Sequence, residues 1–192
     1  MAKRESSFKN MVVALLVITA FAGLALAFVY SVTKEPIAES QRRKINNAIK
    51  MVIPDFDAIS DTVVMPADGK DSIRIHRLMK GGIQVGSAVE TYTNKGFAGH
   101  FSLMVGFKTD GAISNIEVLE HKETPGLGTK MALPSFKDQF RGVKPDDVPG
   151  GILKVKKDGG TVDAITAATI SSRAFCDAVN RANEVNKKGG KK

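Results

Sequence analysis

The chain has 192 residues and a formal net charge of +8 at pH 7, with three histidines and no tryptophan. Its single cysteine, Cys176, excludes a disulfide within the chain and the cysteine clusters that hold zinc or iron–sulfur groups, and the scattered histidines indicate no metal site. The basic charge suits anionic lipid headgroups or an acidic partner, whereas the lack of interleaved basic and aromatic residues argues against nucleic acid.

The first predicted element is an uncharged apolar stretch, residues 11–32, that follows a short segment, residues 1–10. A helix of this length spans roughly 33 Å and can cross a hydrocarbon core of about 30 Å. A cleaved signal peptide is the alternative, because Ala25-Leu26-Ala27 resembles a cleavage site. The apolar run continues beyond that site and favours a retained transmembrane helix. Flanking charges do not decide its orientation, but a large domain after a short N-terminus favours a cytoplasmic N-terminus.

The next segment, residues 33–58, is expected to connect the membrane to the domain as an amphipathic helix. Its apolar residues recur at helical spacing: Ile37, Ile45, Ala48, Ile49 and Val52. Pro54 is expected to end the helix.

Residues 59–186 read as one domain, followed by a solvated basic tail, residues 187–192. Alternating apolar residues predict strands at 62–65, 72–79, 83–93, 99–108 and 112–121. Thr109-Asp110-Gly111 indicates a hairpin between the last two. A short helix is expected after Pro134, short strands at 152–155 and 161–165, and a final amphipathic helix from near Ser171. This order predicts an α+β fold with an antiparallel sheet.

A glycine-containing stretch, HKETPGLGTK at residues 121–130, follows the last predicted hairpin strand. Gly126 and Gly128 would let the backbone lie flat against a planar ligand. Thr124 offers a hydroxyl, and Leu127 offers an apolar face. Taken alone, the same residues also suit an ordinary turn in a surface loop.

A second stretch, DAITAATISS at residues 163–172, lies directly before the final helix. Unpaired backbone N–H groups at a helix N-terminus carry partial positive charge and attract anions such as phosphate. An ordinary helix cap explains these ten residues equally well.

Together, the two stretches resemble the FMN-binding domain found in the G subunit of Rnf complexes and in the C subunit of Na⁺-translocating NADH:quinone reductases. The family motif runs Asp, two variable residues, Ser or Thr, usually Gly, Ala and Thr. The matching positions are Asp163, Thr166, Ala168 and Thr169, while Ala167 stands where the family usually has Gly. The loop at residues 96–100 also resembles the family's glycine–aromatic loop, and the short chain fits the Rnf protein better.

The resemblance implies that Thr169 carries FMN through a phosphoester bond. Thr166, Ser171 and the backbone amides at the helix start would hold the remaining phosphate oxygens, and Asp163 would serve recognition by a flavin transferase. The ring would be lined by Glu123, Thr124, Gly126, Leu127 and Gly128. Neither a catalytic residue nor a metal ligand is expected in this chain.

The implied function is electron relay by one subunit of an Rnf-type ferredoxin:NAD⁺ oxidoreductase coupled to Na⁺ or H⁺ translocation. The implied location is the inner membrane, with a single span and the large domain on the periplasmic side. Multi-span and iron–sulfur subunits, the flavin transferase and membrane lipid are the implied partners. Two alternatives stay open: a flavoprotein of another extracytoplasmic electron-transfer chain, and a membrane-anchored assembly module without redox function.

Overall fold

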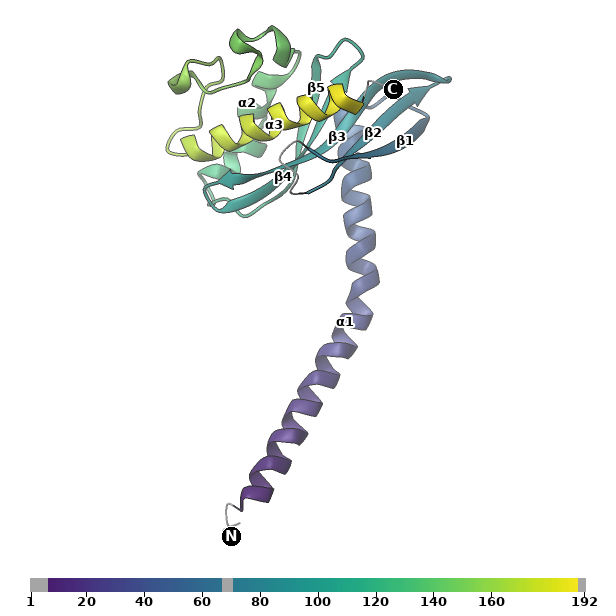
Figure 1. Ribbon diagram of the computed structural model, residues 1–192, viewed down its shortest axis with the longest axis vertical. Helices are drawn as coiled ribbons and strands as arrows, with labels where there is room; N and C mark the ends of the chain where they lie inside the picture. Colours follow the sequence, from purple (N-terminus) through teal and green to yellow (C-terminus); the bar gives the residue numbers. More distant parts are fainter. Residues whose placement is uncertain (1–6, 67–70, 190–192) are drawn as a thin grey trace. The chain divides into compact units, whose positions relative to one another are not determined.

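The computed structural model describes residues 7–66 and 71–189. The predicted segment 1–10 and the predicted tail 187–192 lie partly outside these described residues. The chain divides after Arg43 into two compact units, an N-terminal helical unit and a domain that begins at Lys44 (Figure 1).

The first helix, α1, runs from Phe8 to Val52. It covers the whole apolar stretch 11–32, whose side chains are exposed, and it is long and apolar enough to cross a membrane. The helix continues through Pro36 and ends two residues before Pro54. Residues 53–57 lie outside any helix or strand, so the segment 33–58 is helical only as far as Val52.

The domain is built on a five-stranded antiparallel sheet with the strand order β1-β2-β3-β4-β5. Its strands are β1 (Ala58–Val64), β2 (Ile73–Lys80), β3 (Ile83–Gly96), β4 (Gly99–Lys108) and β5 (Ile113–His121). All five predicted strands and the hairpin at Thr109-Asp110-Gly111 are confirmed, with shifts at the strand ends. The backbone N–H of Lys108 donates to the carbonyl of Ala112 at 2.8 Å and closes this hairpin.

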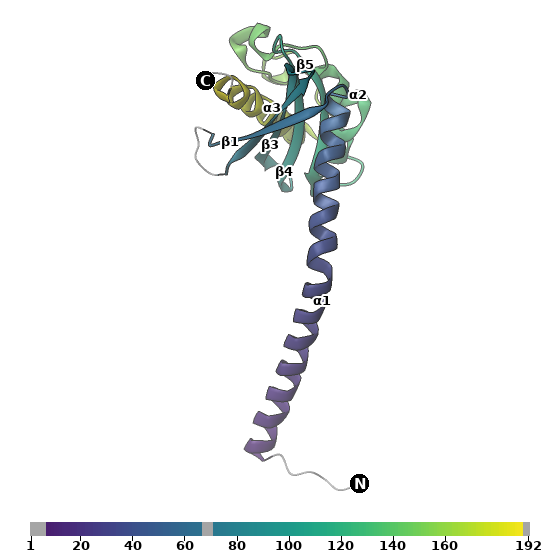
Figure 2. The same cartoon turned by 90° about the vertical axis from the view of Figure 1, so that its right-hand side faces the viewer.

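The sheet separates two apolar clusters, one on each face. The last helix, α3 (Thr169–Gly189), packs on one face, and Figure 2 shows it beside the sheet. The end of α1 packs on the other face, where the cluster comprises Ala48, Ile49, Val52, Ile53, Leu78, Ala88 and Met104. The predicted apolar spacing of this segment therefore has a packing role. Helices on an antiparallel sheet confirm the predicted α+β class.

Three hydroxyl side chains of β3 hold α3 in place along the sheet. Ser87 donates to the side chain of Asn186 at 2.7 Å, and Thr91 donates to the carbonyl of Ala178 at 3.1 Å. Thr93 donates to Asp177 at 2.8 Å. Because odd-numbered residues share one face of a strand, all three contacts fall on the face that α3 covers, and they hold the middle and the end of the helix on the sheet.

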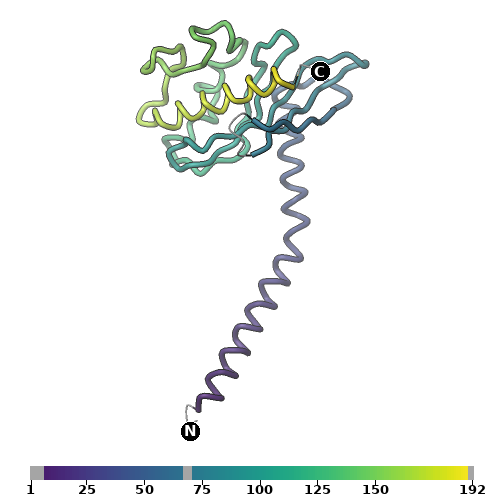
Figure 3. Tube along the Cα trace, viewed as in Figure 1, coloured from purple at the N-terminus to yellow at the C-terminus, as the bar shows by residue number. Residues whose placement is uncertain are grey.

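The segment between β5 and α3 contains a short helix and several single turns, shown in green in Figure 3. They are η1 (Gly128–Ala132), α2 (Pro134–Lys137), η2 (Asp138–Phe140), η3 (Pro145–Asp147), η4 (Pro149–Gly151) and η5 (Lys156–Asp158). The helix after Pro134 is confirmed. The strands predicted at 152–155 and 161–165 are wrong, because only an isolated parallel bridge joins Val155 to Val162. A single bridge does not extend into the ladder that a strand needs.

Candidate functional site

The start of α3 forms a tight turn that leaves helix donors available. The backbone N–H of Ala168 donates to the carbonyl of Ile165, and that of Ser172 donates to the carbonyl of Ala168, both at 3.0 Å. The first bond within the helix therefore begins with Ser172. The N–H groups of Thr169, Ile170 and Ser171 precede it and have no acceptor inside the helix, as is general at helix N-termini. These three groups and the helix dipole favour an anion.

Ala167 adopts a backbone conformation that is unusual for its side chain. Its φ angle is 61°, and it is the one non-glycine residue with positive φ among the described residues. This left-handed conformation costs an L-residue roughly 1–2 kcal/mol. It is also the conformation that glycine adopts readily, and Ala167 stands where the motif usually has glycine. The turn before Thr169 is thus kept in shape at an energetic cost.

A hollow of about 290 Å³ lies at the start of α3. Three separate segments of the chain supply its walls. The lining residues are Phe97, Glu123, Thr124, Leu127, Gly128, Ala167, Ala168, Thr169, Ile170 and Ser171. Its size is near the lower end of the range for small-molecule sites. The structure therefore brings the two stretches that were singled out in the sequence to one place.

The buried carboxylate of Glu123 joins the three segments. One oxygen, Oε1, accepts the backbone N–H of Ala98 at 3.1 Å, and the other, Oε2, accepts the hydroxyl of Ser171 at 2.6 Å. A Cβ atom at Gly96 or at Gly128 would collide with this carboxylate. Both glycines therefore allow the loops to approach Glu123 closely, and this contact shapes the wall of the hollow.

Six of the nine predicted site residues line the hollow, and three lie outside its lining. Thr166 is exposed in the turn before α3. Asp163 is exposed and forms an ion pair with Lys156 at 2.8 Å. Gly126 has a φ angle of 75°, and its N–H donates to the hydroxyl of Thr129 at 3.0 Å. It therefore shapes the loop rather than the wall.

The structure adds wall residues that were not among the predicted site residues: Phe97, Ala167, Ala168 and Ile170. Phe97 lies between Gly96 and Gly99 and is 68% exposed, which is unusual for a phenylalanine. An aromatic residue between two glycines was the available sequence signal. Ile170 is 49% exposed on the first turn of α3, and no sequence pattern distinguishes it from the helix's core residues.

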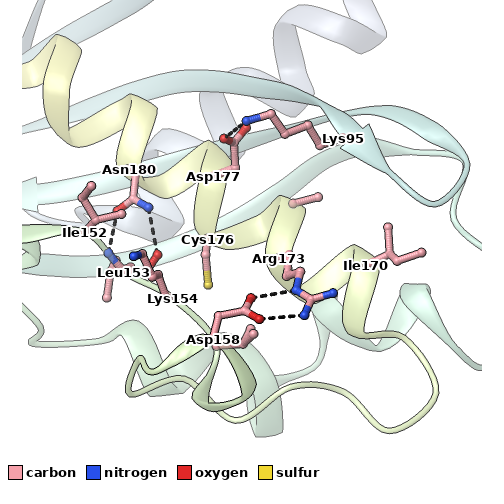
Figure 4. A pocket seen from close by; sticks show the side chains of 12 residues that line it. Lys95, Ile152, Leu153, Lys154, Asp158, Ile170, Arg173, Cys176, Asp177 and Asn180 are labelled. Atoms are coloured by element: carbon pink, nitrogen blue, oxygen red, sulfur yellow. Dashed lines mark hydrogen bonds and ion pairs between the residues drawn. The ribbon is translucent and has the colours of Figure 1, made fainter. Parts of the chain in front are cut away.

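A second hollow, of about 460 Å³, is shown in Figure 4, and it shares the lining residue Ile170 with the first. Arg173 donates two hydrogen bonds to Asp158 at 2.7 and 2.6 Å, and Lys95 contacts Asp177 at 2.6 Å (Figure 4). Asp158 has a pKa below its usual range because Arg173 donates to it. Most charged groups here are paired with each other, so this hollow offers less to an anionic ligand than the start of α3.

Cys176 also lines the second hollow but is not a reactive thiol. Burial, with a smaller contribution from the charge of Asp158, raises its pKa to about 12. Because the thiolate is the reactive form, the thiol stays protonated and inert at neutral pH. The larger hollow therefore contains no activated nucleophile from this cysteine.

The residues around the smaller hollow fit a flavin mononucleotide. Backbone N–H groups at a helix start suit a phosphate, and Thr169 is half-buried among them. Phe97, Leu127 and Ile170 present exposed apolar surface to a planar ring. A side chain at Gly128 would fill part of this space, since its Cβ atom would also meet the Ser171 hydroxyl at 2.8 Å.

Comparison with known proteins supports this assignment. The FMN-binding domain family matches residues 96–184, a range that contains all three segments of the hollow. The C subunit of the Na⁺-translocating NADH-quinone reductase from Parabacteroides distasonis has a similar fold, with a TM-score of 0.54 at 16% identity, covering 77% of this chain and 94% of that one.

Several relatives match along most of their length, including the following two. The G subunit of the ion-translocating oxidoreductase complex of Aliivibrio fischeri is 32% identical over 180 residues, which is 87% of this chain and 86% of the relative. The corresponding protein of Methanosarcina acetivorans is 33% identical over 178 residues, which is 90% of this chain and 91% of the relative. The chain therefore belongs to the family of G subunits of ion-translocating oxidoreductase complexes, and it contains an FMN-binding domain.

Proposed function

We propose that this chain is a membrane-anchored electron-transfer subunit that carries FMN on Thr169 through a phosphoester bond. The observation that carries the proposal is the position of Thr169, the first residue of α3, in the wall of the 290 Å³ hollow. A threonine hydroxyl, three N–H groups without helical acceptors and an apolar wall occur together there. Bound FMN supplies reversible one- and two-electron chemistry, while the protein supplies position, charge and protection.

Each of the three segments that line the hollow would contact a different part of FMN. The N–H groups of Thr169, Ile170 and Ser171 hold the phosphate, because the hydroxyl of Ser171 is already donated to Glu123. Phe97 and Leu127 exclude water from the ring. Thr124 and the backbone of the 121–130 loop offer hydrogen bonds to the polar edge of the ring.

The two exposed motif residues, Thr166 and Asp163, would take part in the attachment of FMN and do not line the hollow. Thr166 provides a hydroxyl in the turn that leads to Thr169, where it can assist in holding the phosphate. Asp163 is exposed on the surface before this turn, so it is accessible to a flavin transferase. Its ion pair with Lys156 joins two exposed side chains, and such pairs contribute little stability. A transferase can therefore displace it at little cost.

The chain is anchored in a membrane through the apolar part of α1. We propose that the domain lies on the extracytoplasmic side and passes electrons between other subunits of an Rnf-type ferredoxin:NAD⁺ oxidoreductase. The stretch 11–32 has no charged residue, and ionisable groups within a membrane usually mark ion pathways. Translocation of Na⁺ or H⁺ is therefore a task of partner subunits with several spans.

Attachment of the flavin is tested by co-expressing the full chain with a flavin transferase and recording flavin fluorescence in a denaturing gel. The native chain should give a fluorescent band, and Thr169→Val should abolish it. Thr109→Val, at an exposed threonine in the β4–β5 turn, is the matched control and should keep covalent fluorescence. A dark native band would reject the covalent link, and fluorescence that persists in Thr169→Val would place the bond elsewhere.

Purification of the intact membrane complex tests the electron-transfer role. Co-purification with multi-span and iron–sulfur subunits is expected for an Rnf-type complex. Co-purification with a single terminal reductase would instead favour another extracytoplasmic electron-transfer chain. A chain that assembles with partners but carries no flavin would support an assembly module.

A further inference from the structure

We propose that the buried charge of Glu123 lowers the reduction potential of the flavin held in the 290 Å³ hollow. This inference rests on the proposed function, because it concerns the flavin site. It assigns to Glu123 a task beyond lining the ring: its carboxylate contributes a negative electrostatic potential at the ring.

The hydrogen-bond partners of Glu123 suit a carboxylate. The residue is only 5% exposed. Both of its oxygens accept hydrogen bonds, one from the Ala98 backbone and one from the Ser171 hydroxyl. A carboxylate accepts at both oxygens, whereas a protonated carboxyl group would use one oxygen as a donor. These two bonds are the charge-assisted type that stabilises a buried negative charge.

The partners of this carboxylate are neutral groups. Among residues 7–66 and 71–189, no lysine, arginine or histidine forms an ion pair with Glu123. Its neighbour Lys122 is exposed. The compensating groups are the two hydrogen-bond donors, together with the N-terminus of α3, where Ser171 is the third residue. The hollow therefore keeps a net negative contribution from this side chain.

A negative charge beside the ring opposes reduction, because reduction adds electrons to the ring. Charges interact more strongly in a partly buried site than in bulk water. The reduced state of the flavin is therefore raised in energy relative to the oxidised state. Such a site holds a flavin that gives up electrons more readily, which suits a relay that must pass them on.

The decisive variant is Glu123→Gln in the flavin-loaded full chain. The glutamine oxygen can accept from Ala98, and its amide group can donate to the Ser171 hydroxyl, so both contacts are retained while the charge is lost. In an anaerobic redox titration, the ratio of reduced to oxidised flavin at a fixed potential should rise at least tenfold. For a two-electron couple this is a positive shift of about 30 mV or more.

Glu120→Gln is the matched control. Glu120 lies on β5, three residues before Glu123 in the chain, is exposed and does not line the hollow. Glu120→Gln removes one negative charge, as Glu123→Gln does, but from the surface, where solvent and salt screen the charge. The midpoint potential of this control should stay at the native value. A shift equal to that of Glu123→Gln would overturn the inference, because the effect would then reflect net charge alone.

Two further variants separate charge from packing. Glu123→Asp keeps the negative charge and shortens the side chain. The midpoint potential of the flavin in this variant should therefore stay closer to the native value than in Glu123→Gln. Ser171→Ala removes a donor from the carboxylate and should move the midpoint in the negative direction. These two variants also decide the matter if Glu123→Gln does not fold.

The inference fails if Glu123→Gln titrates at the native potential, or if Glu123→Asp shifts as far as Glu123→Gln does. Either result would reduce Glu123 to a packing role. Absence of covalent flavin from the native chain is a different outcome, because it rejects the flavin attachment before any potential is measured.

Discussion

Ala167 departs from the family motif but adopts the backbone conformation that a glycine would take, with a φ angle of 61°. The turn before Thr169 therefore has the expected shape in spite of the substitution. Alanine in place of glycine lowers the stability of the turn but leaves its shape unchanged. The substitution is therefore compatible with Thr169 as the attachment residue.

Ala167→Gly should stabilise the protein. Glycine adopts the left-handed conformation without the strain of alanine, and this effect is larger than the added entropy of the unfolded chain. The free energy of unfolding should therefore rise by about 1 kcal/mol. Chemical denaturation of the purified chain measures this change. Ala164→Gly is the control: Ala164 has no positive φ angle, so the same substitution should lower the free energy of unfolding. Equal effects of the two variants would contradict the strain at Ala167.

Because of Cys176, we expect the free energy of unfolding to depend on pH in the alkaline range. Burial raises its pKa to about 12 in the folded protein, whereas a free thiol has a pKa of about 8.5. The folded state thus holds this proton more tightly than the unfolded state. The stabilising contribution is fully present below pH ~8.5 and is lost progressively as pH rises toward 12.

Denaturation of the native chain and of Cys176→Ala between pH 7 and 11 tests this dependence. The difference between their free energies of unfolding should be constant up to pH ~8.5 and then shrink, by at most about 1.4 kcal/mol per pH unit. Parallel curves over the whole range would show that the thiol does not titrate differently in the two states.

Among the elements, the end of α1 packs closely on the sheet because β4 has a glycine at the contact. A Cβ atom at Gly106 would lie 2.7 Å from the Cβ of Val52. This contact lies in the cluster on the face of the sheet opposite α3. The helical spacing of apolar residues in the segment 33–58 predicted an apolar helix face, but which glycine of the sheet contacts this face depends on strand pairing.

Gly106→Ala should destabilise the domain by about 1–3 kcal/mol, because the added methyl group overpacks this contact. Val52→Ala keeps Cβ but removes Cγ2, which would lie 3.1 Å from the added methyl group. The double variant should therefore lose somewhat less stability than the sum of the two single variants. Urea denaturation of the full chain in detergent measures all four proteins. Strict additivity would show that the two residues do not contact each other in solution.

The predicted elements succeeded where a local pattern was present. The five strands, the hairpin and the last helix follow from alternation, turn residues and helical spacing. The strands predicted at 152–155 and 161–165 failed, because short apolar runs do not show whether a partner strand is available. The start of α3 at Thr169, two residues earlier than predicted, depends on the bond between Ser172 and Ala168.

For the molecule as a whole, the side of the membrane occupied by the domain is testable with an introduced thiol. Thr109→Cys places one in the exposed β4–β5 turn. A membrane-impermeant maleimide should label it in intact spheroplasts, because the domain is proposed to face outward. The native Cys176 is 3% exposed and has a raised pKa, so it should give little background labelling.

Ser7→Cys provides the opposite control, since Ser7 precedes α1. It should react only after the spheroplasts are lysed. Labelling of Thr109→Cys only after lysis would place the domain in the cytoplasm and overturn the proposed topology.

Local sequence patterns were sufficient to predict the membrane-spanning stretch, the α+β class and the position of Thr169 close to the start of the last helix. These features depend on residues that are close together in the chain. The meeting of Phe97, the 123–128 loop and the start of α3 in one hollow became visible only in the folded domain. That convergence depends on a buried carboxylate 25 residues from Ala98 and 48 residues from Ser171. Such contacts form only when α3 packs on the sheet, so no local pattern encodes them.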